Sequence, residues 1–582
     1  MQWLVMITCL CVAGTGAAVH GHKHHHGHDG HHHDQDVRES GTPVTATPAG
    51  AIRGSWMETR RGRRFHAYRG IPFAEPPVGE LRFQPPKPIK QYSGEVDATE
   101  EGPACPQPTL SPDYYVDEDC LRLNVYTPGR TNSSKLLPVI VYMHPGGFYS
   151  VSGRSDVAGP HYLLEEDVVY VALNYRLAAL GFISTGDEHA PGNNGFKDQV
   201  IALRWIQRNI AAFGGDPDLV TLTGYSAGSF SIALHMVSPM SRGLFHRAIA
   251  MSASPISQVV IGNEQKYLAE RQAKLLNCST DTSKQIIDCL KTKTWRELGN
   301  SLDNMFEFGF DPVLMWNVVV EPDFGQERFL TEQPLDIIRR GDFYAVPIII
   351  SQTQDEFFWK AFNILANATR MQAMNEDWER IAPIAFMLPP EGAAVASRRL
   401  RKAYLNDNPL RNDSTSADGL GKLYSDSIIG FAVHRMANLM CRYSPQPVWY
   451  YEFGYVGQHS HYEDPITKKP VGAAHHDDLI YLFTLPAAFP AVPLNSADDR
   501  IVERMVALWY NFARFGDPRP HSCDTPQLAG LRWPEMKPRD RKYLRIDSEL
   551  SIGKNLFEDR FRVWDELYAL PEDSSSSSSE DD

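Results

Sequence analysis

The stretch LVTLTGYSAGSF, residues 219–230, carries the strongest structural signal in the chain. Its first half, LVTLT, is apolar and β-branched and predicts a strand, whereas Ser229–Val237 predicts a helix. Between them stands Gly224-Tyr225-Ser226-Ala227-Gly228, the G-x-S-x-G pattern of a sharp turn that exposes a serine at the carboxyl edge of a sheet. Glycines are needed there because strand and helix approach closely. The pattern predicts Ser226 as a nucleophile and places the Ala227 N–H near a developing negative charge.

The sequence around this turn alternates strand and helix patterns. Leu137–His144 and Val168–Asn174 are apolar, β-branched runs that predict strands. Asp198–Phe213 has apolar residues at helical spacing and is followed by two glycines that end a helix. The alternation predicts an α/β protein with a large central, mostly parallel sheet flanked by helices.

A second glycine-containing turn follows the first of these strands. His144-Pro145-Gly146-Gly147-Phe148 is similar to the oxyanion loop of esterases, and the N–H groups of Gly146 and Gly147 can join that of Ala227. Pro145 has no N–H to donate, but it falls one place before the two expected donors. We therefore expect an oxyanion hole made by these three N–H groups.

The amino terminus has the pattern of a secretory signal. Trp3–Ala13 is apolar and is followed by small residues up to Ala18, so residues 1–18 are predicted to be a signal peptide and the protein to be secreted and extracellular. Cleavage leaves an even number of cysteines, which suits an oxidising compartment. Short sequence separations favour two of the possible disulfides and leave the two remaining cysteines to form a third. The alternative is that the cysteines are buried free thiols. The expected disulfides are Cys105–Cys120, Cys278–Cys289 and Cys441–Cys523, and the predicted glycosylation sites are Asn132, Asn277, Asn367 and Asn412.

Polar segments of unusual composition flank the body of the chain. Residues 19–44 include nine histidines between His20 and His33, and residues 569–582 are acidic and serine-rich, so both are predicted to be disordered. The histidines could bind a metal weakly, or the segment could be a solvated spacer. The body, residues 45–568, is expected to form one domain, with no structural metal site and no cofactor. A net charge of -14 argues against nucleic-acid partners, and no later apolar run or tail predicts a membrane anchor.

The body closely resembles the type-B carboxylesterase and cholinesterase family. The resemblance covers about residues 45–568 and looks nearest to secreted insect carboxylesterases. It is carried by RGIPFAEPPVGELRFQPP (69–86), EDCLRLNVYTP (118–128), NNGFKDQVIALRW (193–205), FGGDP (213–217) and GYSAGS (224–229). It implies an α/β-hydrolase fold and cleavage of small carboxylic esters.

The resemblance also implies the other catalytic residues. Asp355-Glu356 follows the apolar run Val346–Ile350 and matches the family's acidic pair, whose second member is the catalytic acid. Residues 472–479 match the family's histidine loop, with His475 as the base and His476 at a variable place. The order serine, acid, histidine is that of this fold. His475 is expected to take the serine proton, and Glu356 to orient the imidazole during formation of an acyl-enzyme.

Further matches imply structural roles. Relatives form salt bridges at the positions of Arg69 with Glu118 and of Arg176 with Asp198, and they place a serine behind the triad at the position of Ser252.

Departures from the family widen the predicted substrate range. Residues 106–119 contain no Trp, which cholinesterases use there to hold a quaternary ammonium. Tyr225 stands where cholinesterases carry Glu and juvenile hormone esterases Gln, so a broader carboxylesterase is expected. A catalytically silent adhesion protein, or a protein that sequesters lipophilic ligands, remains the alternative.

Overall fold

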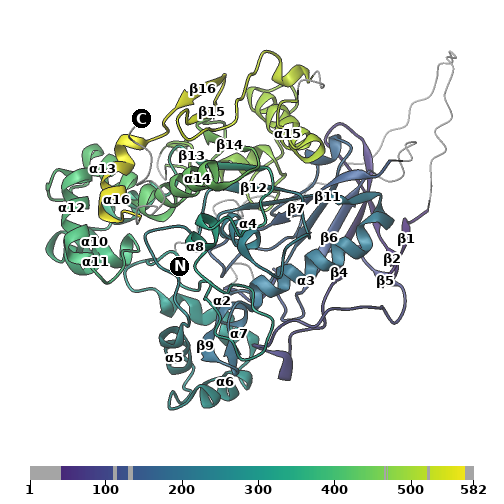
Figure 1. Ribbon diagram of the computed structural model, residues 1–582, viewed down its shortest axis with the longest axis horizontal. Helices are drawn as coiled ribbons and strands as arrows, with labels where there is room; N and C mark the ends of the chain where they lie inside the picture. The colour runs from purple at the N-terminus through teal and green to yellow at the C-terminus, as the bar shows by residue number, and fades with distance from the viewer. Residues whose placement is uncertain are drawn as a thin grey trace, which may run out of the picture.

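The protein is built around an 11-stranded sheet (Figure 1). The computed structural model describes residues 41–108, 114–128, 135–464, 467, 469–520 and 525–570. From one edge to the other the strands are β16 (Leu550–Lys554), β15 (Lys542–Ile546), β14 (Val448–Phe453), β13 (Ile348–Thr353), β12 (Arg247–Met251), β11 (Gly215–Tyr225), β7 (Leu137–Met143), β8 (Val169–Leu173), β6 (Arg122–Thr127), β4 (Arg64–Pro72) and β3 (Ser55–Glu58).

The middle of the sheet is parallel and its margins are antiparallel. Every neighbouring pair from β15 to β8 runs parallel, while β16, β6, β4 and β3 pair antiparallel. The predicted α/β architecture, a large mostly parallel sheet with flanking helices, is confirmed. The strand predicted over 219–223 is longer than expected, because β11 also pairs with β7 at Gly215, beyond an irregularity in register.

Helices cover both faces of the sheet. They are α2 (Ala178–Phe182), α3 (Asn194–Asn209), α4 (Ala227–Val237), α5 (Lys266–Leu275), α6 (Ser283–Lys291), α7 (Trp295–Asn300), α8 (Pro334–Arg339), α9 (Lys360–Leu365), α10 (Ala368–Glu376), α11 (Trp378–Ala385), α12 (Ala393–Leu405), α13 (Ser414–Ser425), α14 (Phe431–Tyr443), α15 (Ala497–Phe515) and α16 (Glu558–Leu567). In the part of the chain that the structure describes, none of the helices has the length and apolar composition that crossing a bilayer requires.

The two faces of the sheet belong to separate hydrophobic clusters. Along β7, Val139 and Val141 pack in the cluster that includes α3, α4 and α14, whereas Ile140 and Tyr142 pack in the cluster that includes α15. This alternation follows from the period of two of a strand. The helix predicted over 198–213 begins earlier, at Asn194, and its last turn is a separate 3-10 turn that ends at Gly214, which has φ 84°.

Smaller sheets and covalent links complete the body. β1 (Val44–Thr47), β2 (Gly50–Arg53) and β5 (Val96–Asp97) form one small sheet, and β9 (Ser184–Asp187) pairs with β10 (Ala190–Pro191). The structure contains the disulfides Cys105–Cys120 and Cys278–Cys289. Cys441 is half-buried and unpaired among the described residues, and its predicted partner Cys523 lies outside them.

One of the two predicted framework salt bridges is wrong. Arg176 pairs with Asp198 as expected, with both side chains buried. Glu118, however, pairs with Arg82 rather than Arg69. Arg82 also donates to the carbonyls of Lys291 and Lys293, so it joins the first disulfide loop to the chain beyond the second. Arg69 instead lies 3.9 Å from Glu101, because the turn after β5 brings that carboxylate alongside β4.

Several predictions fall outside the described residues. They are the signal peptide (1–18), the histidine-rich segment up to residue 40, the sequon at Asn132 and the acidic tail from residue 571. We expected residues 19–44 to be disordered and the body to begin at residue 45. The first strand, β1, begins one residue earlier, at Val44.

Candidate active site

Ser226 occupies a strained turn between β11 and α4. Its φ of 53° and ψ of -118° are unusual for a residue with a side chain. Its N–H donates to the Met251 carbonyl at 2.8 Å, which ties the turn to the end of β12. The serine is partly exposed although Tyr225 and Ala227 on either side are buried. The turn therefore presents one hydroxyl at the carboxyl edge of the sheet, as the G-x-S-x-G pattern predicts.

The two glycines of the turn are required by packing. A Cβ on Gly228 would overlap the Met143 carbonyl oxygen at the end of β7, and a Cβ on Gly224 would overlap the backbone of Gly228. Neither glycine has positive φ, so close approach rather than backbone conformation explains them.

The predicted oxyanion loop follows β7, the neighbour of β11. Gly146 and Gly147 have φ of 111° and 57°, and a side chain on either would collide with the loop itself. The Gly146 carbonyl accepts from the N–H groups of Tyr149 and Ser150 at 2.9 and 3.0 Å. The N–H groups of Gly146 and Gly147 donate to no acceptor within the described residues, so they are available to a ligand.

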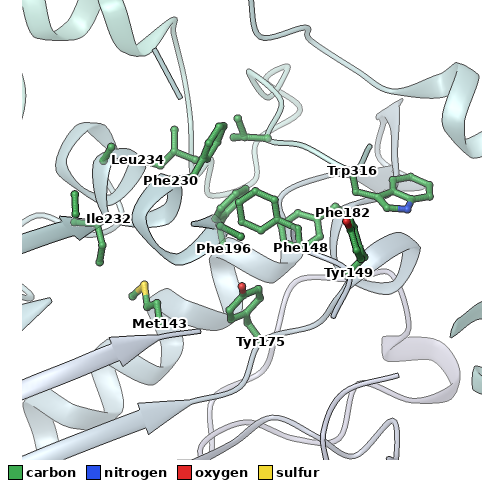
Figure 2. Close-up of a cluster of buried hydrophobic side chains, with 14 of the residues drawn as sticks. Met143, Phe148, Tyr149, Tyr175, Phe182, Phe196, Phe230, Ile232, Leu234 and Trp316 are labelled. Carbon is green, nitrogen blue, oxygen red and sulfur yellow. The ribbon is translucent and has the colours of Figure 1, made fainter. Parts of the chain in front are cut away.

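Phe148 anchors this loop in the core. Its ring is buried, and its centroid lies 5.1, 5.3 and 5.5 Å from the ring centroids of Phe182, Phe196 and Phe230. Figure 2 shows these four side chains gathered together. Rigid aromatic packing of this kind holds the two preceding N–H groups in place.

His144, at the start of the loop, has a structural role. Its ring stacks on Tyr175 with centroids 4.3 Å apart, and its Nδ1 lies 2.7 Å from the Pro145 carbonyl oxygen. Burial lowers the pKa of His144 to about 4, so the imidazole is neutral at physiological pH.

The histidine and acid that were expected from the resemblance meet at the same edge of the sheet. His475 Nδ1 bonds to Glu356 Oε2, and the His475 N–H donates to the Glu356 carbonyl at 3.0 Å. The other carboxylate oxygen of Glu356 accepts from the Thr353 N–H at 2.8 Å. His475 and Glu356 are 3% and 1% exposed, so solvent does not compete for their bond. His475 Nε2 has no hydrogen-bond partner among the described residues, so it is able to accept a proton from another group.

Sheet order explains why these groups lie close together. Gly146, Ser226, Ser252 and Glu356 follow β7, β11, β12 and β13, four consecutive strands of the sheet. The ends of parallel strands meet at one edge, where ligands bind in open α/β sheets. Ser252 is fully buried with φ 55°, and its hydroxyl has no partner in the described part of the chain.

Asp478 is a buried acid that we did not predict for this site. It is fully buried, and its Oδ2 accepts from the Tyr451 hydroxyl at 3.1 Å. Burial, reinforced by the Glu356 charge, raises the pKa of Asp478 to about 8. The two acids that follow His475-His476 are visible in the sequence and could have suggested an acid near the base. The sequence does not show, however, that the side chain of the second acid is buried.

Comparisons with known proteins agree with this geometry. The sequence model of the carboxylesterase family matches residues 41–564. The chain is 35% identical to a juvenile hormone esterase of Tribolium castaneum, covering 90% of this chain and 93% of that protein. It is 33% identical to a carboxylic ester hydrolase of Bombus ignitus, covering 90% of this chain and 93% of that protein.

A solved structure shares the whole architecture. The crystal structure of juvenile hormone esterase from Manduca sexta, with OTFP covalently attached, matches with a TM-score of 0.79 and 28% identity. The match covers 91% of this chain and all of that one. The chain therefore belongs to the carboxylesterase family and is a serine hydrolase of carboxylic esters.

Proposed function

We propose that the protein is a secreted carboxylesterase in which Ser226 is the nucleophile, His475 the general base and Glu356 the acid that orients it. The observation that carries this proposal is the buried His475–Glu356 pair, whose free Nε2 lies at the sheet edge that also exposes the Ser226 turn. A base oriented by a buried carboxylate, next to a serine in a strained turn, is the arrangement that acyl transfer requires.

In the first half-reaction Ser226 Oγ bonds to the ester carbonyl carbon while its proton passes to His475 Nε2. The carbonyl oxygen becomes an oxyanion that the N–H groups of Gly146, Gly147 and Ala227 stabilise. Collapse breaks the bond to the alcohol oxygen, which leaves with the proton from His475. In the second half, water gives a proton to His475 while its oxygen bonds to the acyl carbon. Collapse then breaks the bond from that carbon to Ser226 Oγ, His475 returns the proton to Oγ, and the carboxylic acid is released.

Secretion is supported by the amino-terminal pattern and by features of the body. Two disulfides lie in the body, and oxidising compartments favour them. The sequon residues Asn277, Asn367 and Asn412 are all exposed and therefore accessible to glycosylation.

The proposed substrates are uncharged esters. The first disulfide loop lacks the Trp that holds a quaternary ammonium, and the residue before the nucleophile is the buried Tyr225 rather than a carboxylate. Aromatic rings also flank the base, since the Phe357 centroid lies 4.4 Å from that of His475. Since neither that Trp nor a carboxylate before the nucleophile is present to hold a cation, we expect alkyl and aryl esters to be preferred over choline esters.

Turnover of a short-chain aryl ester by the purified secreted protein tests the proposal. We expect 4-nitrophenyl acetate to be hydrolysed by the wild type, and Ser226→Ala to lose about a thousandfold or more in kcat. Full activity in Ser226→Ala would refute the assigned nucleophile. The matched control is Ser238→Ala, a buried serine at the other end of α4, which should keep wild-type turnover.

A further inference from the structure

The loop that carries His475 is held by hydrogen bonds from several directions. The Ala473 N–H donates to Asp355 Oδ2 at 3.1 Å and the Ala474 N–H to Asp477 Oδ2 at 2.9 Å. The His475 N–H donates to the Glu356 carbonyl, and the Asp477 N–H closes a turn on Ala474. These bonds tie the loop to itself and to the segment that carries the acid.

The bond of the next residue has a different partner. The His476 N–H donates to the Tyr225 hydroxyl at 2.9 Å, across 251 positions of the sequence. Tyr225 is the last residue of β11, directly before Ser226. Among the described residues, this is the hydrogen bond that joins the strand of the nucleophile to residues 473–477.

The backbone at this point needs such a partner. His476 has φ 81°, a left-handed conformation that costs a residue with a side chain roughly 1–3 kcal/mol and persists only where its surroundings impose it. The Tyr225 ring packs against both histidines, with its centroid 5.0 Å from that of His475 and 4.9 Å from that of His476. The tyrosine therefore contacts the catalytic imidazole and also fixes the peptide unit that follows it.

The phenol remains neutral in this environment. Tyr225 is fully buried, and burial raises its pKa well above the ordinary value. The charges of Asp478 and Glu356 act in the same direction, while the hydrogen bond from the His476 N–H opposes it. A neutral hydroxyl oxygen can accept from an N–H without adding charge beside the His475–Glu356 pair.

We propose that Tyr225 is a positioning residue that sets the distance and orientation of His475 relative to Ser226 by accepting the His476 N–H bond. This proposal rests on the proposed function, in which Ser226 is the nucleophile and His475 is the base, because it concerns how His475 is positioned to accept the Ser226 proton. The chain thus uses the variable position of its G-x-S-x-G motif to connect the nucleophile strand to the base loop. A base that is displaced by a fraction of an ångström transfers protons more slowly even when substrate still binds.

Tyr225→Phe tests this, since it removes one oxygen and keeps the ring. We expect kcat for 4-nitrophenyl acetate to fall about tenfold or more with KM within about twofold, and the rate of phosphorylation by an organophosphate to fall in parallel. Tyr142→Phe is the matched control, because Tyr142 is a buried tyrosine on the adjacent strand β7 and its hydroxyl has no partner among the described residues. It should keep wild-type kcat.

Two further measurements separate the possible failures. If Tyr225→Phe does not accumulate as folded protein, 3,5-difluorotyrosine placed at position 225 keeps a weaker acceptor, and a fall in kcat of about twofold or more is expected. Wild-type kcat in the folded Phe variant, or in the difluoro variant, would overturn the positioning role. An organophosphate adduct on a residue other than Ser226 in the wild type would instead overturn the proposed function on which this inference rests.

Discussion

His475 and Glu356 form a buried hydrogen bond through Nδ1, while His475 Nε2 has no partner among the described residues. This asymmetry fixes the tautomer, because the nitrogen facing the carboxylate carries the hydrogen and the opposite nitrogen keeps its lone pair. A neutral imidazole held in this way is ready to accept the serine proton. In the proposed mechanism, this bond makes His475 rather than the neighbouring His476 the base.

His475→Ala should reduce kcat by about a thousandfold or more, whereas His476→Ala should reduce it by less than about tenfold. The reason is geometric, since only the His475 side chain reaches Glu356 and His476 contributes its backbone N–H to Tyr225. Steady-state turnover of both variants checks this. The reverse ranking would make His476 the base.

Asp478 should make stability depend on pH between about pH 5 and 8. Its folded-state pKa of about 8 lies above the unfolded value, so over this range the unfolded chain has lost a proton that the folded protein retains. The contribution of this group to stability therefore falls as pH rises and levels off above the folded-state pKa. Asp478→Asn imitates the protonated acid, so its urea midpoint should fall less than that of the wild type between pH 5 and 8. Equal falls in both proteins would contradict this account.

Gly228→Ala should abolish folding or greatly lower the yield of active protein, because the added Cβ would overlap the Met143 carbonyl oxygen. Gly94→Ala is the control, since a Cβ at Gly94 meets no atom within 4 Å. Expression and thermal unfolding of the two variants compare these sites. A Gly228→Ala protein with wild-type stability and activity would show that the close approach is not required.

Cys441 should be joined to Cys523 in the secreted protein. The cysteines of the body are even in number, and the two shorter pairs are already bonded in the structure. Nonreducing peptide mapping should find the 441–523 peptide pair, and the denatured protein should contain no thiol that iodoacetamide labels. A labelled Cys441 would contradict the pairing. Such a free thiol would react slowly in the native protein, because burial raises its pKa to about 11.

The sequence predicted the parts of the site that depend on local pattern. The Ser226 turn and the loop at Gly146-Gly147 each follow a strand with a recognisable apolar run, so the structure finds them where the strands end. Glu356 was different, because it is one of 71 acidic residues and its place depends on β13 lying two strands from β11. Only resemblance to a family could select it.

Other features could not be predicted because they depend on tertiary contacts. The bond from the His476 N–H to Tyr225 requires a left-handed backbone at His476, which composition does not reveal. The resemblance led us to expect Arg69 as the partner of Glu118, but the partner is Arg82. Residue order does not show which of two nearby arginines turns towards the disulfide loop. Long-range side-chain choices of this kind depend on packing.

Covalent labelling with an organophosphate tests the central claim most directly, because an activated serine facing an oxyanion hole attacks phosphorus as it attacks an ester carbonyl. The secreted protein would be inhibited to completion, digested and mapped by mass spectrometry. We predict one adduct, on the peptide containing Ser226, with loss of ester turnover in proportion to labelling. An adduct on another residue, or turnover that persists when Ser226 is fully labelled, would contradict the assignment of Ser226 as the nucleophile.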